Sequence, residues 1–187
     1  TTGKLTIDKM DMAAIAGLAP ALAGQFGAEV EFAAVGEAPR DVMNSLALKG
    51  RLAMTNGTVQ LPWSDGASAA PAQLRQVAAS LRFDDLDSAS ELQGSGLIGD
   101  RPVDFHLSLP LRRVINGEEL PVTAKVTAGG VTSSYTGRVN RALPTVAGAL
   151  TLEAPSLAEV AGLFGWPSAG LPAGAVTLNG DIEAADG

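Results

Sequence analysis

The feature that most constrains this fold is a two-residue alternation of apolar and polar side chains, which recurs in short runs along the chain. It is clearest where the apolar positions are Val103, Phe105, Leu107 and Leu109, each separated from the next by a polar residue. Successive side chains of a β-strand point to opposite faces of the sheet, so this pattern predicts a strand with one buried face.

Strand-like runs of this kind occupy most of the chain, and turn signals separate them. Asn56-Gly57, Asn116-Gly117 and Gly129-Gly130 are typical of hairpin turns. The sequence therefore predicts a mainly β fold, an antiparallel meander of hairpins that forms a curved sheet, an open sandwich or a groove. The predicted strands cover residues 4–8, 28–36, 46–54, 58–61, 79–87, 91–98, 103–109, 120–127, 131–137, 146–152 and 175–184.

Two or three short helices are predicted within this β pattern. The first begins near Asp8 or Asp11 and runs through residue 18, and the second follows Ser156, a typical N-cap residue. Both segments contain Ala-Gly-Leu in the same register and lead into a strand, which predicts one helix-and-strand unit that occurs twice. A third helical turn is predicted at residues 39–45, because proline suits the first position of a helix.

Gly94, Gly96 and Gly99 have the G-x-G-x-x-G spacing of dinucleotide-binding loops. Such a loop must open a helix whose first amide groups face the phosphates. Here Asp100, Arg101 and Pro102 are followed by a strand pattern instead. The three glycines are therefore predicted to belong to a strand, turn and strand, and no nucleotide is expected to bind them.

The composition excludes several classes of function. Thirteen basic and twenty acidic residues give a net charge of −7, which argues against a nucleic-acid partner. The chain has no cysteine, so disulfides and thiolate chemistry are excluded. Its apolar content is largely aliphatic, because only 4% of the residues are aromatic. No stretch approaches the roughly 20 apolar residues that a membrane-spanning helix needs.

Candidate catalytic and metal-binding residues are few. The single histidine, His106, lies on the polar side of its predicted strand, and the sequence offers it neither a nucleophile nor a carboxylate. We expect it to be exposed or at an edge. Asp84, Asp85 and Asp87, the best oxygen cluster, lack the spacing of a calcium loop and are expected to be a solvated strand end. No catalytic residue, metal or cofactor is therefore predicted.

Trp63 and Trp166 each lie close to a proline. Tryptophans in such places can form a sugar-binding platform or lie at a membrane interface. Sugar-binding surfaces generally need several aromatic rings, so packing at the end of an element is the expected role. An enzyme of carbohydrate chemistry remains as a third alternative, because paired carboxylates could be assembled from the acidic residues.

Three stretches carry a resemblance to a known family. The segment "AGALTLEAPSLAEVAGLFGWPSAGLPAGAVTLNGDIEAADG", residues 147–187, has a strand ending in Ala-Pro-Ser-Leu, a short helix and a proline-containing loop leading to a further strand. The segments "APRDVMNSLALKGRLAMTNGTVQL" and "LQGSGLIGDRPVDFHLSL" add strand-turn-strand patterns rich in Leu-x-Gly. Together they resemble the AsmA family of bacterial envelope proteins.

The resemblance implies an inner-membrane-anchored protein with its body in the periplasm, related to the bridge-like lipid transporters and involved in envelope integrity and outer-membrane biogenesis. The family has no catalytic residues to carry over, so we expect no enzyme. The chain starts at Thr1 without an initiator methionine or a signal sequence. Residues 1–187 are accordingly expected to be a single periplasmic β-rich segment of a longer, membrane-anchored protein.

The candidate site is one apolar surface that contacts phospholipid acyl chains, the lipid being supplied by the family resemblance. An alternative is a closed-core structural or protein-interaction domain without lipid contact, with envelope proteins as its partners. Alternation predicts burial but does not distinguish a groove from a closed core. The expected lipid-facing residues are Val103, Phe105, Leu107 and Leu109, with Val122, Ala124 and Val126 of a neighbouring strand.

Overall fold

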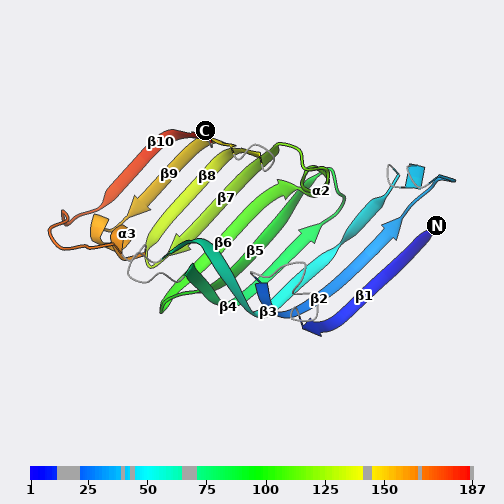
Figure 1. Ribbon diagram of the computed structural model, residues 1–187, viewed down its shortest axis with the longest axis horizontal. Helices are drawn as coiled ribbons and strands as arrows, with labels where there is room; N and C mark the ends of the chain where they lie inside the picture. Colours follow the sequence, from blue (N-terminus) through cyan, green and yellow to red (C-terminus); the bar gives the residue numbers. More distant parts are fainter. Residues whose placement is uncertain are drawn as a thin grey trace.

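The structure is a computed structural model, and it describes the whole chain except residues 12–21, 39–40, 43–44, 65–70, 141–144, 164–165 and 186–187. The described strands form one antiparallel sheet in which each strand pairs with the next along the chain (Figure 1). The sheet is open, with β1 and β10 at its two edges, which confirms the predicted meander. The strands are β1 (Thr2–Asp11), β2 (Leu22–Ala33), β3 (Ala47–Ser64), β4 (Pro71–Phe83), β5 (Ala89–Ile98), β6 (Arg101–Pro110), β7 (Leu120–Ala128), β8 (Val131–Asn140), β9 (Thr145–Ala154) and β10 (Val176–Ala185).

Helix α3 (Leu157–Leu163) confirms the second predicted helix. The hydroxyl oxygen of Ser156 accepts a hydrogen bond from the backbone N–H of Glu159 at 3.2 Å, so Ser156 is its N-cap as predicted. The first helix was predicted to begin near Asp8 or Asp11, but both residues belong to β1. The remainder of that predicted helix lies outside the described residues.

Helix α2 (Leu111–Asn116) was not predicted, and it corrects the assignment of Asn116-Gly117 to a hairpin turn. Gly117 has φ of 69° and caps the C-terminus of α2, and the N–H of Glu118 bonds to the carbonyl of Arg113 at 3.0 Å. A left-handed glycine serves a hairpin turn and a helix C-terminus equally well, so the dipeptide alone could not tell them apart.

The Asn56-Gly57 dipeptide was also predicted wrongly as a turn, because β3 runs through it. Asn56 has φ of 51°, and the register of β3 against β4 shifts at this point, so the two residues form an irregularity within one long strand. Gly129 and Gly130, with φ of 54° and 86°, form the predicted β7–β8 turn. Asp41 and Val42 are helical, in agreement with the third predicted helical turn, but Pro39 lies outside the described residues.

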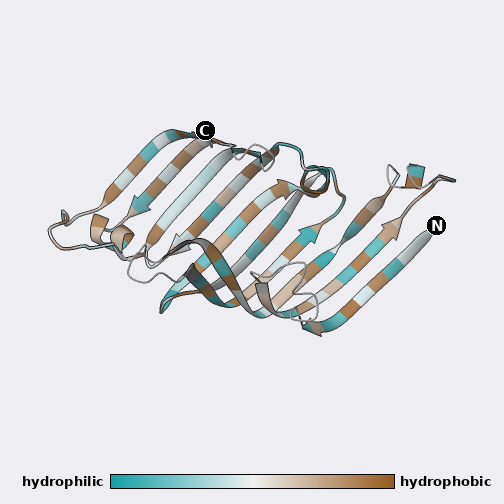
Figure 2. Ribbon diagram, viewed as in Figure 1, coloured by the Kyte–Doolittle hydropathy of each residue, from teal (hydrophilic) through white to brown (hydrophobic). Residues whose placement is uncertain are grey.

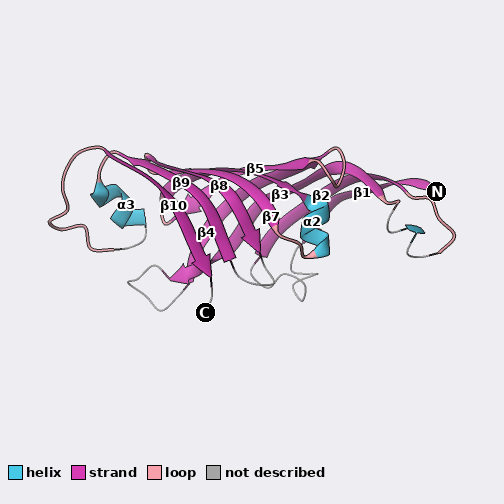
Figure 3. Ribbon diagram, turned by 90° about the horizontal axis from the view of Figure 1, so that it is seen from above, coloured by secondary structure: helices cyan, strands magenta, loops and turns pink. Residues whose placement is uncertain are grey.

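The sheet is a thin curved layer, and α2 and α3 both lie on its concave side (Figure 3). The accessible surface is 11666 Å², whereas a compact monomeric protein of this mass has about 8,300 Å². A small core cluster, formed by Leu74, Val77, Val103 and Ala128, lies at one end of the strands, with Leu163 of α3 packed against it. The described part of the chain places no second sheet over the first.

Candidate functional site

One side of the sheet, here called the apolar face, presents non-polar side chains on every strand. Its continuity follows from the strand register, because residues that are directly opposite in neighbouring strands point to the same side. Bands of alternating hydropathy along the strands show the same pattern in Figure 2. A single row of opposed residues crosses all ten strands, through Ile7, Ala28, Leu52, Leu81, Leu92, Leu107, Ala124, Tyr135, Leu150 and Gly180.

The seven residues predicted to face lipid all lie on this apolar face. Strands β6 and β7 are neighbours, with Phe105 opposite Val126 and Leu107 opposite Ala124, as the alternation predicted. Leu109 and Val122 follow on the same side of their strands. Val103 begins the β6 series opposite Ala128, and both are buried in the core cluster rather than exposed on the face. The prediction named only two strands, whereas the apolar face extends over all ten. The alternation of apolar and polar residues in the other strands could have predicted this extent.

Helices α3 and α2 lie at opposite ends of the strands on the apolar side, and no described helix or strand lies over the middle of the apolar face. At one end Arg101 of β6 bonds to the carbonyl and carboxylate oxygens of Glu159 in α3, at 3.3 and 3.4 Å. At the other end, the backbone N–H of Arg112 in α2 donates to the carbonyl oxygen of Leu86 at 2.7 Å. The Nε–H of Arg112 donates to Oδ1 of Asp87 at 2.6 Å. Leu107 lies between these ends and is only half-buried.

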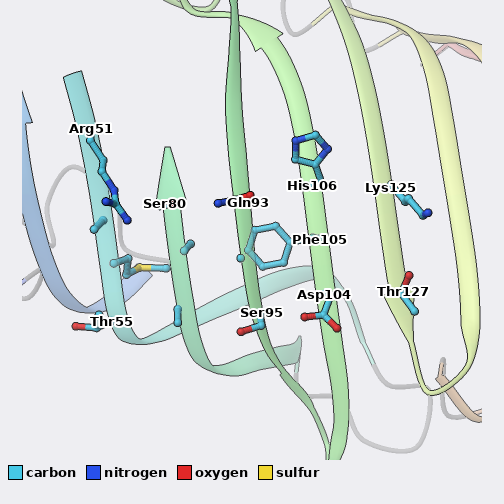
Figure 4. Close-up of a pocket in the computed structure, with 15 residues that line it drawn as sticks. Arg51, Thr55, Ser80, Gln93, Ser95, Asp104, Phe105, His106, Lys125 and Thr127 are labelled. Atoms are coloured by element: carbon cyan, nitrogen blue, oxygen red, sulfur yellow. The ribbon is translucent and has the colours of Figure 1, made fainter. Parts of the chain in front are cut away.

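Glycines on the apolar face make room for rings that lie flat on the sheet. A Cβ placed on Gly94 would lie 2.6 Å from Cζ of Phe105, whose ring lies over β5 (Figure 4). The ring of Tyr135 lies over Gly148 in the same way, 3.0 Å from such a Cβ. These two rings pack against the backbone of the neighbouring strand at its glycine. Gly94 of the G-x-G-x-x-G pattern therefore allows Phe105 of the neighbouring strand to pack closely. Gly99 is followed by strand β6, whereas a nucleotide-binding loop would be followed by a helix.

We predict that Gly94→Ala destabilises the protein by about 1–3 kcal/mol, because the new methyl group would meet both Phe105 and the carbonyl oxygen of Ala78 at 2.6 Å. Gly180→Ala is the matched control, since no atom lies within 4 Å of a Cβ at that position of β10. Urea unfolding of both variants measures the difference. Equal unfolding midpoints for the two variants would contradict the packing role of Gly94.

The opposite side of the sheet, the polar face, carries a shallow hollow of about 670 Å³ (Figure 4). Small residues, among them Ala78 and Ser80, form part of its lining between the longer side chains of Arg51 and Lys125. His106 projects here from a central strand, so it is exposed, as predicted, but not at an edge.

Glu91 of β5 is a carboxylate partner that the sequence did not place beside His106. Its Oε2 lies 2.5 Å from Nε2 of His106. Both side chains are about half exposed, and ion pairs in such surroundings are weakened by water and salt. Because both side chains are this exposed, the pair belongs to the open surface of the polar face and not to an enclosed site.

The acidic residues singled out in the sequence take part in local contacts. Asp85 accepts hydrogen bonds from the hydroxyl and backbone N–H of Ser88, and these lower the pKa of its carboxyl group. Asp84 pairs with Lys49 at 3.6 Å, and Asp87 binds Arg112. Among the described residues, no group of three or more histidine or acidic side chains could hold a metal ion.

Comparisons with protein-family models, curated proteins and solved structures find no match to this chain. In the part of the chain that the structure describes, no helix is long and apolar enough to cross a membrane. The geometry of the apolar face is therefore the main structural basis for assigning a function.

Proposed function

We propose that this chain is a non-enzymatic module of the bacterial envelope, the periplasmic segment of an AsmA-like membrane-anchored protein, and that its apolar face holds phospholipid acyl chains. The observation that supports this proposal is the apolar row that crosses all ten strands through Leu92, Leu107 and Leu150. Aliphatic side chains without hydrogen-bonding groups suit a ligand that is itself a hydrocarbon.

The dimensions of the sheet also favour acyl chains. Neighbouring strands lie about 4.8 Å apart, so ten strands span about 43 Å. One leaflet contributes about 15 Å to the hydrocarbon core of a bilayer, which is roughly 30 Å thick. The apolar face is therefore long enough to hold an acyl chain laid across the strands.

The alternative function, a structural or protein-interaction domain with a closed core, requires a second layer over the middle of the apolar face. The described elements supply cover only at the two ends, through α2 and α3. A partner protein would have to supply the rest. No specific observation favours an enzyme of carbohydrate chemistry.

Lipid analysis of the natively purified protein tests the proposal. We expect phospholipid in roughly stoichiometric amount, and we expect Leu107→Glu to lose most of it because a carboxylate would lie in the acyl-chain path. Thr123→Glu is the matched control, since Thr123 is exposed on the polar face and lies opposite the uncharged residues Ser108 and Thr136. The absence of phospholipid, or equal amounts in the two variants, would contradict the proposal.

A further inference from the structure

The segment that runs from α3 into β10 contains several exposed apolar side chains. Trp166 and Leu171, here called the tip, lie in the connection, and the side chain of Trp166 is 58% exposed. Leu178 and Ile182 follow on the apolar face of β10, and Leu178 is 55% exposed. Exposed large apolar residues that lie close together mark a surface that binds another apolar surface, and Trp166 and Leu171 lie within six residues of each other in one connection.

The connection projects from the sheet, and the folded chain holds its base. Figures 1 and 3 show it extending outward from the β9 and β10 end of the sheet. The backbone N–H of Trp166 donates to the carbonyl of Ala161 in α3 at 2.9 Å, and that of Leu171 donates to Ser168 at 3.3 Å. Leu163 of the same helix packs against the core cluster. The backbone of Trp166 is thus bonded to a helix that packs on the apolar face.

The charge pattern identifies the chemistry of the partner. Between Glu159 and Asp181 the sequence contains no aspartate, glutamate, lysine, arginine or histidine, although the whole chain has a net charge of −7. A surface that binds another protein usually has an apolar centre surrounded by a rim of polar residues. An uncharged projection that carries tryptophan suits the boundary between lipid headgroups and acyl chains, where an amphipathic ring is stabilised.

We propose that the tip docks on the surface of a phospholipid bilayer, with Trp166 and Leu171 at the level of the headgroups. This inference rests on the proposed function, because a sheet that holds phospholipid acyl chains must exchange them with a membrane.

Vesicle binding of the 187-residue chain tests this docking, with vesicles made of phosphatidylcholine alone. In a Trp63→Phe variant, which leaves Trp166 as the single tryptophan, we expect a blue shift of the emission and quenching by vesicles with brominated acyl chains. In sedimentation with the same vesicles, the double variant Trp166→Ala and Leu171→Ser is expected to bind about tenfold more weakly, since its buried apolar area is smaller.

Ile115→Ser is the matched control, because Ile115 is 61% exposed on α2, at the other end of the strands. We expect it to bind vesicles as the unaltered chain does. No vesicle binding by the unaltered chain, or an equal loss in the control and the double variant, would overturn the docking proposal. Phospholipid in the natively purified protein is measured separately, so its absence beside intact, tip-dependent vesicle binding would contradict the proposed function alone.

Discussion

Val103→Glu is expected to unfold the protein, whereas Leu107→Glu, four residues later on the same side of β6, is expected to leave it folded. Val103 is only 3% exposed and belongs to the core cluster beneath α3, so its replacement would bury an unpaired carboxylate. That change costs about 3 kcal/mol or more, a large part of the stability of a typical domain. At Leu107 the carboxylate would stay hydrated, and we expect a loss of about 1 kcal/mol or less.

Urea unfolding followed by circular dichroism measures both effects, with Thr123→Glu as the control on the polar face. A Leu107→Glu variant that unfolds as readily as Val103→Glu would show that a further layer covers the middle of the apolar face. That result would favour the closed-core alternative over a lipid-holding surface.

Much of the fold could be predicted from the sequence, because alternation is a local property of each strand. The β5–β6 and β7–β8 hairpins needed only their own residues, including Gly99 and the Gly129-Gly130 pair. Asn56 was misassigned because a positive φ can belong to a bulge as well as to a turn. Helix α2 was missed because it is only six residues long and has no side-chain N-cap, so it left little periodic signal.

The candidate site could be predicted in part. Alternation placed Phe105 and Val126 on one side of neighbouring strands, and the structure pairs them. It could not show that Phe105 lies over Gly94, because packing between strands depends on their register. Nor could it show which part of the face stays open, since that depends on where α2 and α3 come to lie.

Photo-crosslinking at Leu107 tests the central claim most directly. A photoreactive amino acid replaces Leu107 in the whole protein in membranes, and a second variant carries it at His106, the preceding residue, which faces the polar side. Irradiation followed by mass spectrometry identifies what each position captures. We expect phospholipid adducts at Leu107 and none above background at His106. Capture of a protein or of no lipid at Leu107, or of equal lipid at both positions, would contradict a lipid-holding apolar face.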